Sequence, residues 1–428
     1  MSTILGPFIH SGYLALKIPR FLISHLAGVF GIPSAAMEML RAATTLAGVD
    51  TQSLPTELVP VNAVQFSRGL LNFAFFQSNL DWEFPLWARR QFDPADPSFV
   101  PRSHLGLTMN VTQRNWTAVG SPQCQFEPIV DPAGMVTPFR DRWSIDTWIG
   151  TGGDLHIPAR LNVRQSLLHH YPVVVTEFVA GTLPVRLSTF VDGSTLFHTV
   201  RVTNAGPDRT SGSVFIAMRP FNPEGVGMIR SIRFERETLR FIIDDADILR
   251  LDRAPSSVHC STYEDGDSAR HATRFESASA DCRADDASMS VAGTAAVECQ
   301  SGLANAYCRI PFDLVPGGQD EIEVCIPLGE SAQSVSAHTC SGTAADHLNR
   351  MTMKWDDLLR RGATISTPDP TLNRLLNSSL ISLLLLTDGD SITPGPASYH
   401  HFWIRDAAYM VNALDAYGHH EFTRPIID

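Results

Sequence analysis

A short stretch of the chain around residue 400 carries side chains that suit the binding of a sugar. A loop rich in Pro and Gly, 394-PGPAS-398, leads into aromatic, basic and acidic residues at the start of a helix-like segment. A Trp ring can stack on the C–H groups of a pyranose, while Asp accepts and Arg donates hydrogen bonds to hydroxyls. The candidate substrate-binding residues are Tyr399, His401, Trp403, Arg405 and Asp406.

The same residues have a purely structural interpretation. Asp406 would lie in the first turn of the helix, where a negative charge interacts favourably with the helix dipole. Arg405 would then simply pair with this carboxylate. Residue types and spacing alone do not decide between a helix N-terminus and a sugar site.

Few other residues are arranged for chemistry. Glu224 lies in the loop 219-RPFNPEGVG-227, where it could carry a carboxylate towards a domain interface, although turn chemistry explains this loop equally well. The His-His pairs at 169–170 and 419–420 lack the spacing and the clustered acids of a metal site. We therefore expect no metal and no cofactor, and the catalytic residues stay unassigned.

The composition is that of a globular protein of 428 residues. Hydrophobic residues make up 44% and charged residues 18%, which excludes disorder or a coiled coil for most of the chain. Lys and Arg number 33 against 45 Asp and Glu, a net charge of −12 that repels nucleic acid at long range. Because we find no basic patch, we expect neutral molecules and no nucleic acid as partners.

Residues 1–59 form an apolar N-terminal extension. Lys17 and Arg20 followed by 21-FLISHLAGVFGIP-33 resemble a secretory signal, and a docking helix or a start codon placed too far upstream are the alternatives. A His and a Pro interrupt the apolar run, so no membrane-spanning helix is expected. We favour a cytoplasmic protein and keep the secretory signal as the alternative.

Six of the seven cysteines lie between residues 260 and 340. An odd total without a Cys-x-x-Cys pair argues against a zinc knuckle and against a closed set of disulfides. Several lie in strand-like runs such as 306-AYCRIPFDLV-315, where a free Cys behaves as a small buried hydrophobe. Free buried cysteines are therefore favoured, with up to three disulfides as the alternative.

From about residue 160 the pattern changes to short β-branched runs separated by Gly, Asp, Asn and Pro. Such runs without helices between them predict antiparallel strands in a β-sandwich. Residues 254–296, rich in Ser, Ala, Asp and Gly, are expected to form long exposed loops. Five Trp residues between 82 and 148 indicate an aromatic core or, alternatively, a carbohydrate-stacking surface. The predicted strands are 173–180, 183–191, 197–204, 212–218, 238–245, 306–315 and 321–327.

Near residue 344 the spacing of the apolar residues changes to that expected of a helix. Segment 344–361 is predicted to be a helix that ends at Gly362, and 372–387 a second, strongly apolar helix. A further helix is expected over 404–417, and another begins at Glu421. The expected domains after the N-terminal extension are a β domain at 60–343, a linker helix and turn at 344–371, and the first helices of an α domain at 372–428.

The C-terminal part of the chain contains a recognisable succession of residues, namely Trp355, Pro368, Asp369, Leu380, Pro394, Gly395, Tyr399, Trp403, Ile404, Arg405, Asp406, Ala413, Leu414 and Gly418. This succession resembles the start of the catalytic toroid in a known superfamily, the six-hairpin glycosidases. Within it, the chain is similar to glucoamylase-like enzymes and to the glucosidase domain of glycogen-debranching proteins. In that superfamily a β-supersandwich precedes an α/α toroid of six helix hairpins through a linker helix. The fold that the resemblance implies is a mainly β supersandwich, a linker helix and the truncated start of the toroid.

The resemblance implies hydrolysis of α-glucosidic or related bonds in oligo- or polysaccharides, mostly with inversion, by one carboxylic acid and one carboxylate. Arg405 and Asp406 would bind the sugar at the cleavage subsite, and Trp403 would line the pocket. Six hairpins need at least about 180 residues, and the chain from Leu372 onwards holds far fewer. The acid and base are therefore expected beyond Asp428, in a missing C-terminal toroid or in another chain that completes it.

Three functional interpretations stay open. The chain is the N-terminal portion of a glycoside hydrolase and is itself inactive, or it is a non-catalytic β-sandwich protein that binds a carbohydrate or a partner. In the third interpretation it is an enzyme in its own right, with Asp406 and Glu224 as its acid pair. In a truncated toroid, inner helix faces such as 383–386 would lack partners and be exposed.

Overall fold

The computed structural model describes residues 75, 81–92, 115–122, 124, 126–223, 225–281, 296–329, 342–397 and 400–428. All of these except Phe75 belong to one compact unit, Asp81–Val100 with Asn110–Asp428. The N-terminal extension at 1–59 lies outside the described residues, as do Tyr399 and Glu224.

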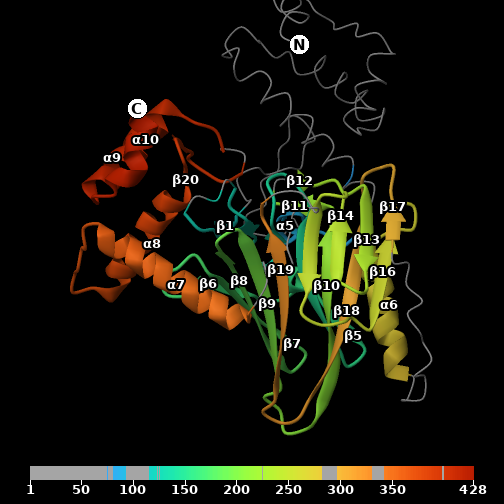
Figure 1. The fold of residues 1–428 in the computed structure, drawn as a ribbon. Coiled ribbons are helices and arrows are strands. Elements are labelled where there is room, and N and C mark those ends of the chain that lie inside the picture. Colours follow the sequence, from blue (N-terminus) through green and yellow to red (C-terminus); the bar gives the residue numbers. More distant parts are fainter. Residues whose placement is uncertain are drawn as a thin grey trace, which may run out of the picture. The chain divides into compact units, whose positions relative to one another are not determined.

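Two antiparallel sheets make up most of the described chain (Figure 1). The first consists, from one edge to the other, of β1 (Thr117–Ala118), β2 (Ile129–Val130), β3 (Val136–Thr137), β4 (Ser144–Thr151), β10 (Thr210–Arg219), β18 (Asn305–Leu314) and β16 (Ser257–Ser261), with β5 (Asp154–His156) paired to β4. The second consists of β17 (Ala296–Glu298), β13 (Ser231–Glu235), β14 (Arg240–Ile243), β15 (Asp247–Leu251), β19 (Gln319–Pro327), β9 (Thr195–Thr203), β8 (Leu183–Asp192), β7 (Val174–Ala180) and β6 (Arg164–Leu167). Smaller elements are α5 (Leu86–Phe92), a 3₁₀ turn at Pro158–Arg160, and the pair β11 (Phe221–Asn222) and β12 (Gly225–Val226).

The two sheets share one hydrophobic core. Val214 and Ile216 of β10 enter it from the first sheet, and Val185 and Leu187 of β8 enter it from the second. In each strand these residues are two apart, as they must be to point to the same face. The antiparallel β architecture predicted from the sequence is thus confirmed for the described residues.

Helices follow the sheets at the positions where the apolar period changes. They are α7 (Ala344–Arg361), α8 (Pro370–Leu385), α9 (Ile404–Ala416) and α10 (His420–Ile427), with a short hairpin of β20 (Thr387–Asp388) and β21 (Ser391–Ile392) between α8 and α9. Thr343 caps α7, because its side chain accepts from the Asp346 backbone while the Asp346 side chain accepts from the Thr343 backbone. Among the described residues, no helix is both long enough and apolar enough to cross a membrane.

The helices α7 and α8 cover the outer face of the second sheet, and this explains its continuous apolar runs. Val175 of β7 packs with Trp355 of α7 and Leu384 of α8, away from the core between the sheets. The strands are therefore apolar on both faces. The expectation that 383–386 would be exposed is wrong for its central residues, because Leu384 and Leu385 are buried by this contact.

A helix covers the outer face of the first sheet as well, on the opposite side from α7 and α8 (Figure 1). This is α6 (Ser268–Asp281), whose Ala269 and Ala272 pack against Trp148 and Tyr307. The expectation of long exposed loops over 254–296 is therefore wrong where the structure describes that segment. Small residues allow α6 to approach the sheet closely, and its polar composition hid its buried side from a search for apolar periodicity.

The Trp-rich segment is mainly a core. Trp82, Trp87, Trp143 and Trp148 are buried, in agreement with the aromatic-core interpretation, while Trp116 is only half-buried.

The cysteines divide into two classes. Cys260, Cys299 and Cys308 are free and buried, as the favoured interpretation predicts, and Cys124 is also free. Cys325 differs, because it forms a disulfide. Cys282 and Cys340 lie outside the described residues.

Gly362, which follows α7, is packed so closely that a larger residue should destabilise the fold. A Cβ atom there would lie 2.5 Å from the Tyr417 carbonyl oxygen and 2.6 Å from His419 Nε2. We expect Gly362→Ala to lower the free energy of unfolding by about 1–3 kcal/mol, since the backbone must move to relieve the overlap. Urea unfolding would measure this change. The control is Gly389→Ser, at an exposed turn with no neighbour within 4 Å of the added Cβ atom, where a side chain strains the local backbone without overlapping another residue. An unchanged Gly362→Ala midpoint would contradict the prediction.

Candidate functional site

The candidate sugar-binding residues lie at the N-terminus of α9, on the surface. Trp403 is the residue before the helix, and its backbone is extended, which turns the chain into α9. The Arg405 side chain is 81% exposed and its Nη2 atom lies 3.7 Å from Asp406 Oδ2. Asp406 stands in the first turn and is half-buried. The structure therefore brings Arg405 and Asp406 together and leaves the Arg405 guanidinium open to a ligand.

The surroundings of this pair are unusually apolar for an exposed surface. Phe402, Ile404 and Tyr409 are all more than half exposed, and Trp403 is one third exposed. His401 is exposed on the same stretch, whereas Tyr399 is outside the described residues. Exposed aromatic rings beside a charged hydrogen-bonding pair are the combination that a sugar site requires. The helix-terminus interpretation of Asp406 holds at the same time, because one carboxylate can serve both roles.

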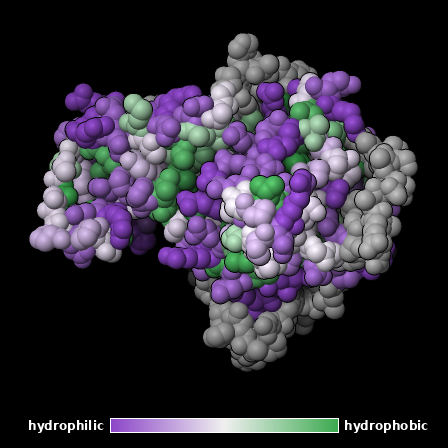
Figure 2. All heavy atoms as spheres, turned by 90° about the horizontal axis from the view of Figure 1, so that it is seen from below, coloured by the Kyte–Doolittle hydropathy of each residue, from purple (hydrophilic) through white to green (hydrophobic). Residues whose placement is uncertain are grey.

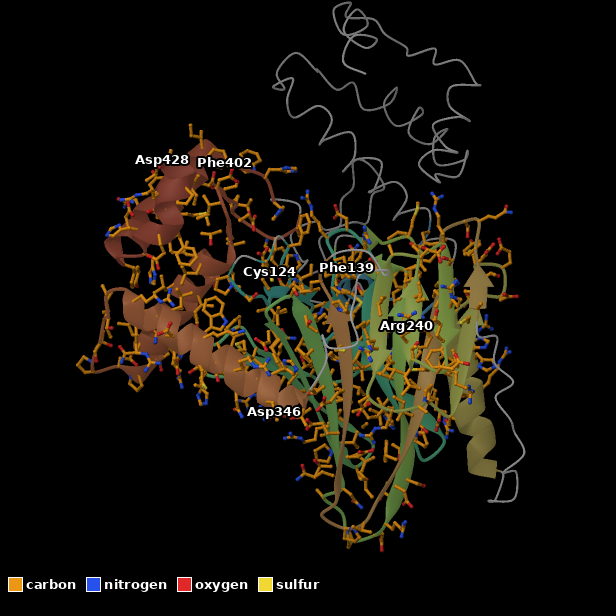
Figure 3. The ribbon with its side chains drawn as sticks, viewed as in Figure 1. Cys124, Phe139, Arg240, Asp346, Phe402 and Asp428 are labelled. Atoms are coloured by element: carbon orange, nitrogen blue, oxygen red, sulfur yellow. The ribbon has the colours of Figure 1, made fainter. Side chains whose placement is uncertain are left out.

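A second group of polar residues lies behind this surface, where the β20–β21 hairpin meets the segment before β2. It consists of Glu127, Asp388 and His400. His400 Nε2 lies 3.6 Å from Asp388 Oδ2, and its ring contacts the ring of Phe126 with centroids 5.0 Å apart. Arg140 Nη1 donates a hydrogen bond of 3.3 Å to the His400 carbonyl oxygen. These contacts tie the residues immediately before α9 to the first sheet. Figure 3 labels Cys124 and Phe139 in this part of the first sheet and Phe402 at the start of α9.

Burial dominates the electrostatics of this group. Burial and the negative charge of Asp388 raise the pKa of Glu127 from 4.5 to about 8. Burial alone raises the pKa of Asp388 to about 6. Burial and the positive charge of Arg140 lower the pKa of His400. At neutral pH Glu127 is therefore protonated, Asp388 is ionised and His400 is neutral.

Two cavities flank the loop that follows β21. The larger, of about 300 Å³, lies between α8 and the edge of the sheets, and its polar lining includes Trp116, His170, Ser378 and Ser382. The smaller, of about 10 Å³, is lined by Glu127, Arg140, Asn222 and Ala397. Figure 2 shows apolar atoms gathered on the face seen from below, where the helices meet the strands. The large cavity is of a size that suits a small ligand, and the small one has room for about one water molecule.

Sequence reasoning did not identify Glu127, Asp388 or the cavity beside Trp116. Glu127 stands in a Pro-rich segment without periodicity, and its burial depends on packing against residues far along the chain. No local signal marks such a contact. In the described part of the chain, no three His, Cys, Asp or Glu side chains lie close enough together to bind a metal ion. His419 is buried, and His169, His170 and His420 are partly or fully exposed.

Comparison with known proteins gives a similarity of fold. A bacterial glucoamylase complexed with acarbose has a TM-score of 0.51 and 12% sequence identity, and the match covers 73% of this chain and 50% of the glucoamylase. A family GH92 inverting mannosidase from Bacteroides thetaiotaomicron matches with a TM-score of 0.40 and 12% identity, over 66% of this chain and 38% of the mannosidase. No protein-family model and no curated protein matches the sequence. The chain thus spans about half the length of the glucoamylase, and the expected resemblance to glucoamylase is confirmed as a resemblance of fold.

Proposed function

We propose that this chain forms the N-terminal part of a glycoside hydrolase that acts on α-glucosidic or related glycans by inverting acid–base hydrolysis. The observation that carries the proposal is the fold similarity to glucoamylase over 73% of the chain, together with the exposed Trp403-x-Arg405-Asp406 group. The two sheets would be the supersandwich, α7 the linker helix, and α8 to α10 the start of the toroid. The acid and base of the reaction are proposed to lie in the remainder of the toroid, so that this chain binds sugar without cleaving it.

The proposed roles follow from exposure and chemistry. The Arg405 guanidinium would donate hydrogen bonds to sugar hydroxyls and the Asp406 carboxylate would accept them. Trp403 would stack on a sugar ring, and His401 and Tyr399 would line the same subsite.

We expect Asp406→Ala to reduce the affinity of the chain for acarbose by about 10- to 100-fold, because hydrogen bonds to a charged group are worth about 1.5–3 kcal/mol. The loss should come from the sugar contact itself, since Arg405 is exposed and tolerates the loss of its partner. Isothermal titration calorimetry would measure it. The matched control is Asp357→Ala, which removes the partner of another exposed arginine, Arg361, on α7. A change of less than about threefold for Asp406→Ala would contradict the assigned role.

A second candidate function is a non-catalytic carbohydrate-binding protein. The observation that favours it is the 300 Å³ cavity, in which half-buried Trp116 stands with the hydroxyl groups of Ser378 and Ser382. The two candidate functions predict that acarbose binding depends on different residues. Loss of acarbose binding in Trp116→Ala, with binding retained in Asp406→Ala, would favour the second function. Release of glucose from malto-oligosaccharides by this chain alone would contradict the proposal that it does not cleave sugar.

A further inference from the structure

Glu127 is a buried acid whose carboxyl group receives no hydrogen bond from another residue that the structure describes. The residue is 4% exposed, and in the described part of the chain neither carboxylate oxygen has a hydrogen-bond partner. Its side chain lies beside Gly120, close to the last residue of α8: a Cβ atom on Gly120 would be 3.4 Å from Glu127 Cγ and 2.9 Å from Leu385 Cδ2. A buried carboxyl group in this state is tolerated only when it carries a proton.

Among the residues that the structure describes, none offers Glu127 a compensating positive charge in contact. Cys124, on its own segment, and Asp388, on β20, both interact with it electrostatically, and negative charge on either opposes its ionisation. Asp388 Oδ1 is also buried without a partner. Arg140 lines the small cavity beside Glu127, but it lies 3.8 Å from Asp141 and its Nη1 is committed to the His400 carbonyl. His400 adds little positive charge, because its lowered pKa leaves it neutral at neutral pH.

We propose that Glu127 is a positioning residue that works through its proton. While the carboxyl group is neutral, the β20–β21 hairpin and the residues from His400 to Trp403 pack on the first sheet. When the proton leaves, the buried Glu127 carboxylate and the half-buried Asp388 carboxylate repel each other, and this packing loosens. The presentation of Trp403, Arg405 and Asp406 then depends on pH, with the ordered state at the acidic end.

Glu127 does not act on a ligand directly. Both of its oxygens are inaccessible to solvent, and the adjoining cavity of about 10 Å³ has no room for a sugar ring. Its effect must pass through the loop instead. The path is short, because Ala397 borders the same cavity and the ring of Phe126, the residue before Glu127, contacts the His400 ring at a tilt of 48°.

Hydrogen exchange, followed by mass spectrometry on the whole chain, tests this role without any sugar. Peptides covering 387–397 and 400–404 would be followed from pH 6 to pH 9, with rates corrected for the intrinsic effect of pH on exchange. We expect wild-type protection in these peptides to fall by about 10-fold or more, with a midpoint near pH 8. In Glu127→Gln, which cannot lose a proton, protection should stay within about 2-fold across the range. Asp388→Asn should move the wild-type midpoint to lower pH, because it removes a negative charge that holds the proton on Glu127.

Three outcomes would overturn the proposal. If the hydrogen-exchange protection of the wild type did not depend on pH, a proton could not control this packing. If Glu127→Gln showed the same pH dependence as the wild type, the proton that controls it would belong to a group other than Glu127. Recovery of wild-type protection at pH 9 on addition of CaCl₂ would identify a cation site in place of a proton. Glu177→Gln, at a partly exposed position on β7 whose side chain is 44% exposed, is the matched control and should follow the wild type. Because the readout is independent of acarbose, its result is separate from the test of the proposed function.

Discussion

Replacing Glu127 with Gln is expected to stabilise the protein relative to wild type by about 4 kcal/mol at pH 8. The amide has nearly the same shape as a protonated carboxyl group and cannot ionise. The two proteins should therefore have similar stability at pH 4.5, where Glu127 is protonated in the folded state, and diverge as the pH rises.

The direction follows from proton binding. The pKa of Glu127 is raised in the folded state from 4.5 to about 8, so between these values the folded protein holds a proton that the unfolded chain releases. The free energy of unfolding must then fall as pH rises from 4.5 to 8, and this contribution levels off above pH 8. Each pH unit in that window costs at most about 1.4 kcal/mol.

Urea unfolding at intervals between pH 4.5 and pH 9 would measure the effect. Asp131 and Asp146 also have raised pKa values, of about 7 and about 6, and they impose the same trend on both proteins. The difference between wild type and Glu127→Gln at each pH therefore isolates Glu127. A difference that does not change with pH would show that Glu127 ionises normally in the folded protein.

The parts of this structure that could be predicted from sequence are those with local signals. The capping pair Thr343 and Asp346 together with Gly362 define α7 within the chain itself. The strands could be predicted because β-branched runs end at Gly, Asn or Asp. Their burial on both faces, as in Phe215 and Ile216 of β10, explains why the runs are apolar without alternation.

The parts that could not be predicted depend on packing between distant segments. The sequence of helix α6 has the composition of a polar loop. Its Ala269 and Ala272 form a buried face only because they pack against Trp148 and Tyr307. The candidate site divides in the same way. Arg405 and Asp406 are adjacent in sequence and could be identified, whereas the electrostatic coupling of Glu127 to Asp388 exists only in the folded chain.

Removal of the Arg219 side chain is the other change with a large expected effect, and it lies outside the candidate site. Arg219 ends β10 and is 1% exposed. Its Nη1 and Nη2 atoms donate hydrogen bonds of 2.5 and 2.8 Å to the two oxygens of buried Asp267, and Nη2 also donates to the Glu83 carbonyl. The guanidinium lies over the Trp148 ring, 5.3 Å from its centroid. It thereby joins α6 and the segment before α5 to the first sheet.

Arg219→Ala should lower the free energy of unfolding by about 3–5 kcal/mol, because it leaves the Asp267 carboxylate buried without its cation. The matched control is Arg209→Ala, which breaks an exposed pair with Asp313 and should leave the free energy of unfolding almost unchanged. The double variant Arg219→Met with Asp267→Asn should recover part of the loss, since it removes both charges and keeps most of the volume. If the double variant were as unstable as Arg219→Ala, the loss would come from the hydrogen bonds and the cation–π contact of the guanidinium and not from the stranded charge. The acarbose affinity that we propose for this chain should be unchanged in the folded fraction, because this network holds α6 and not α9.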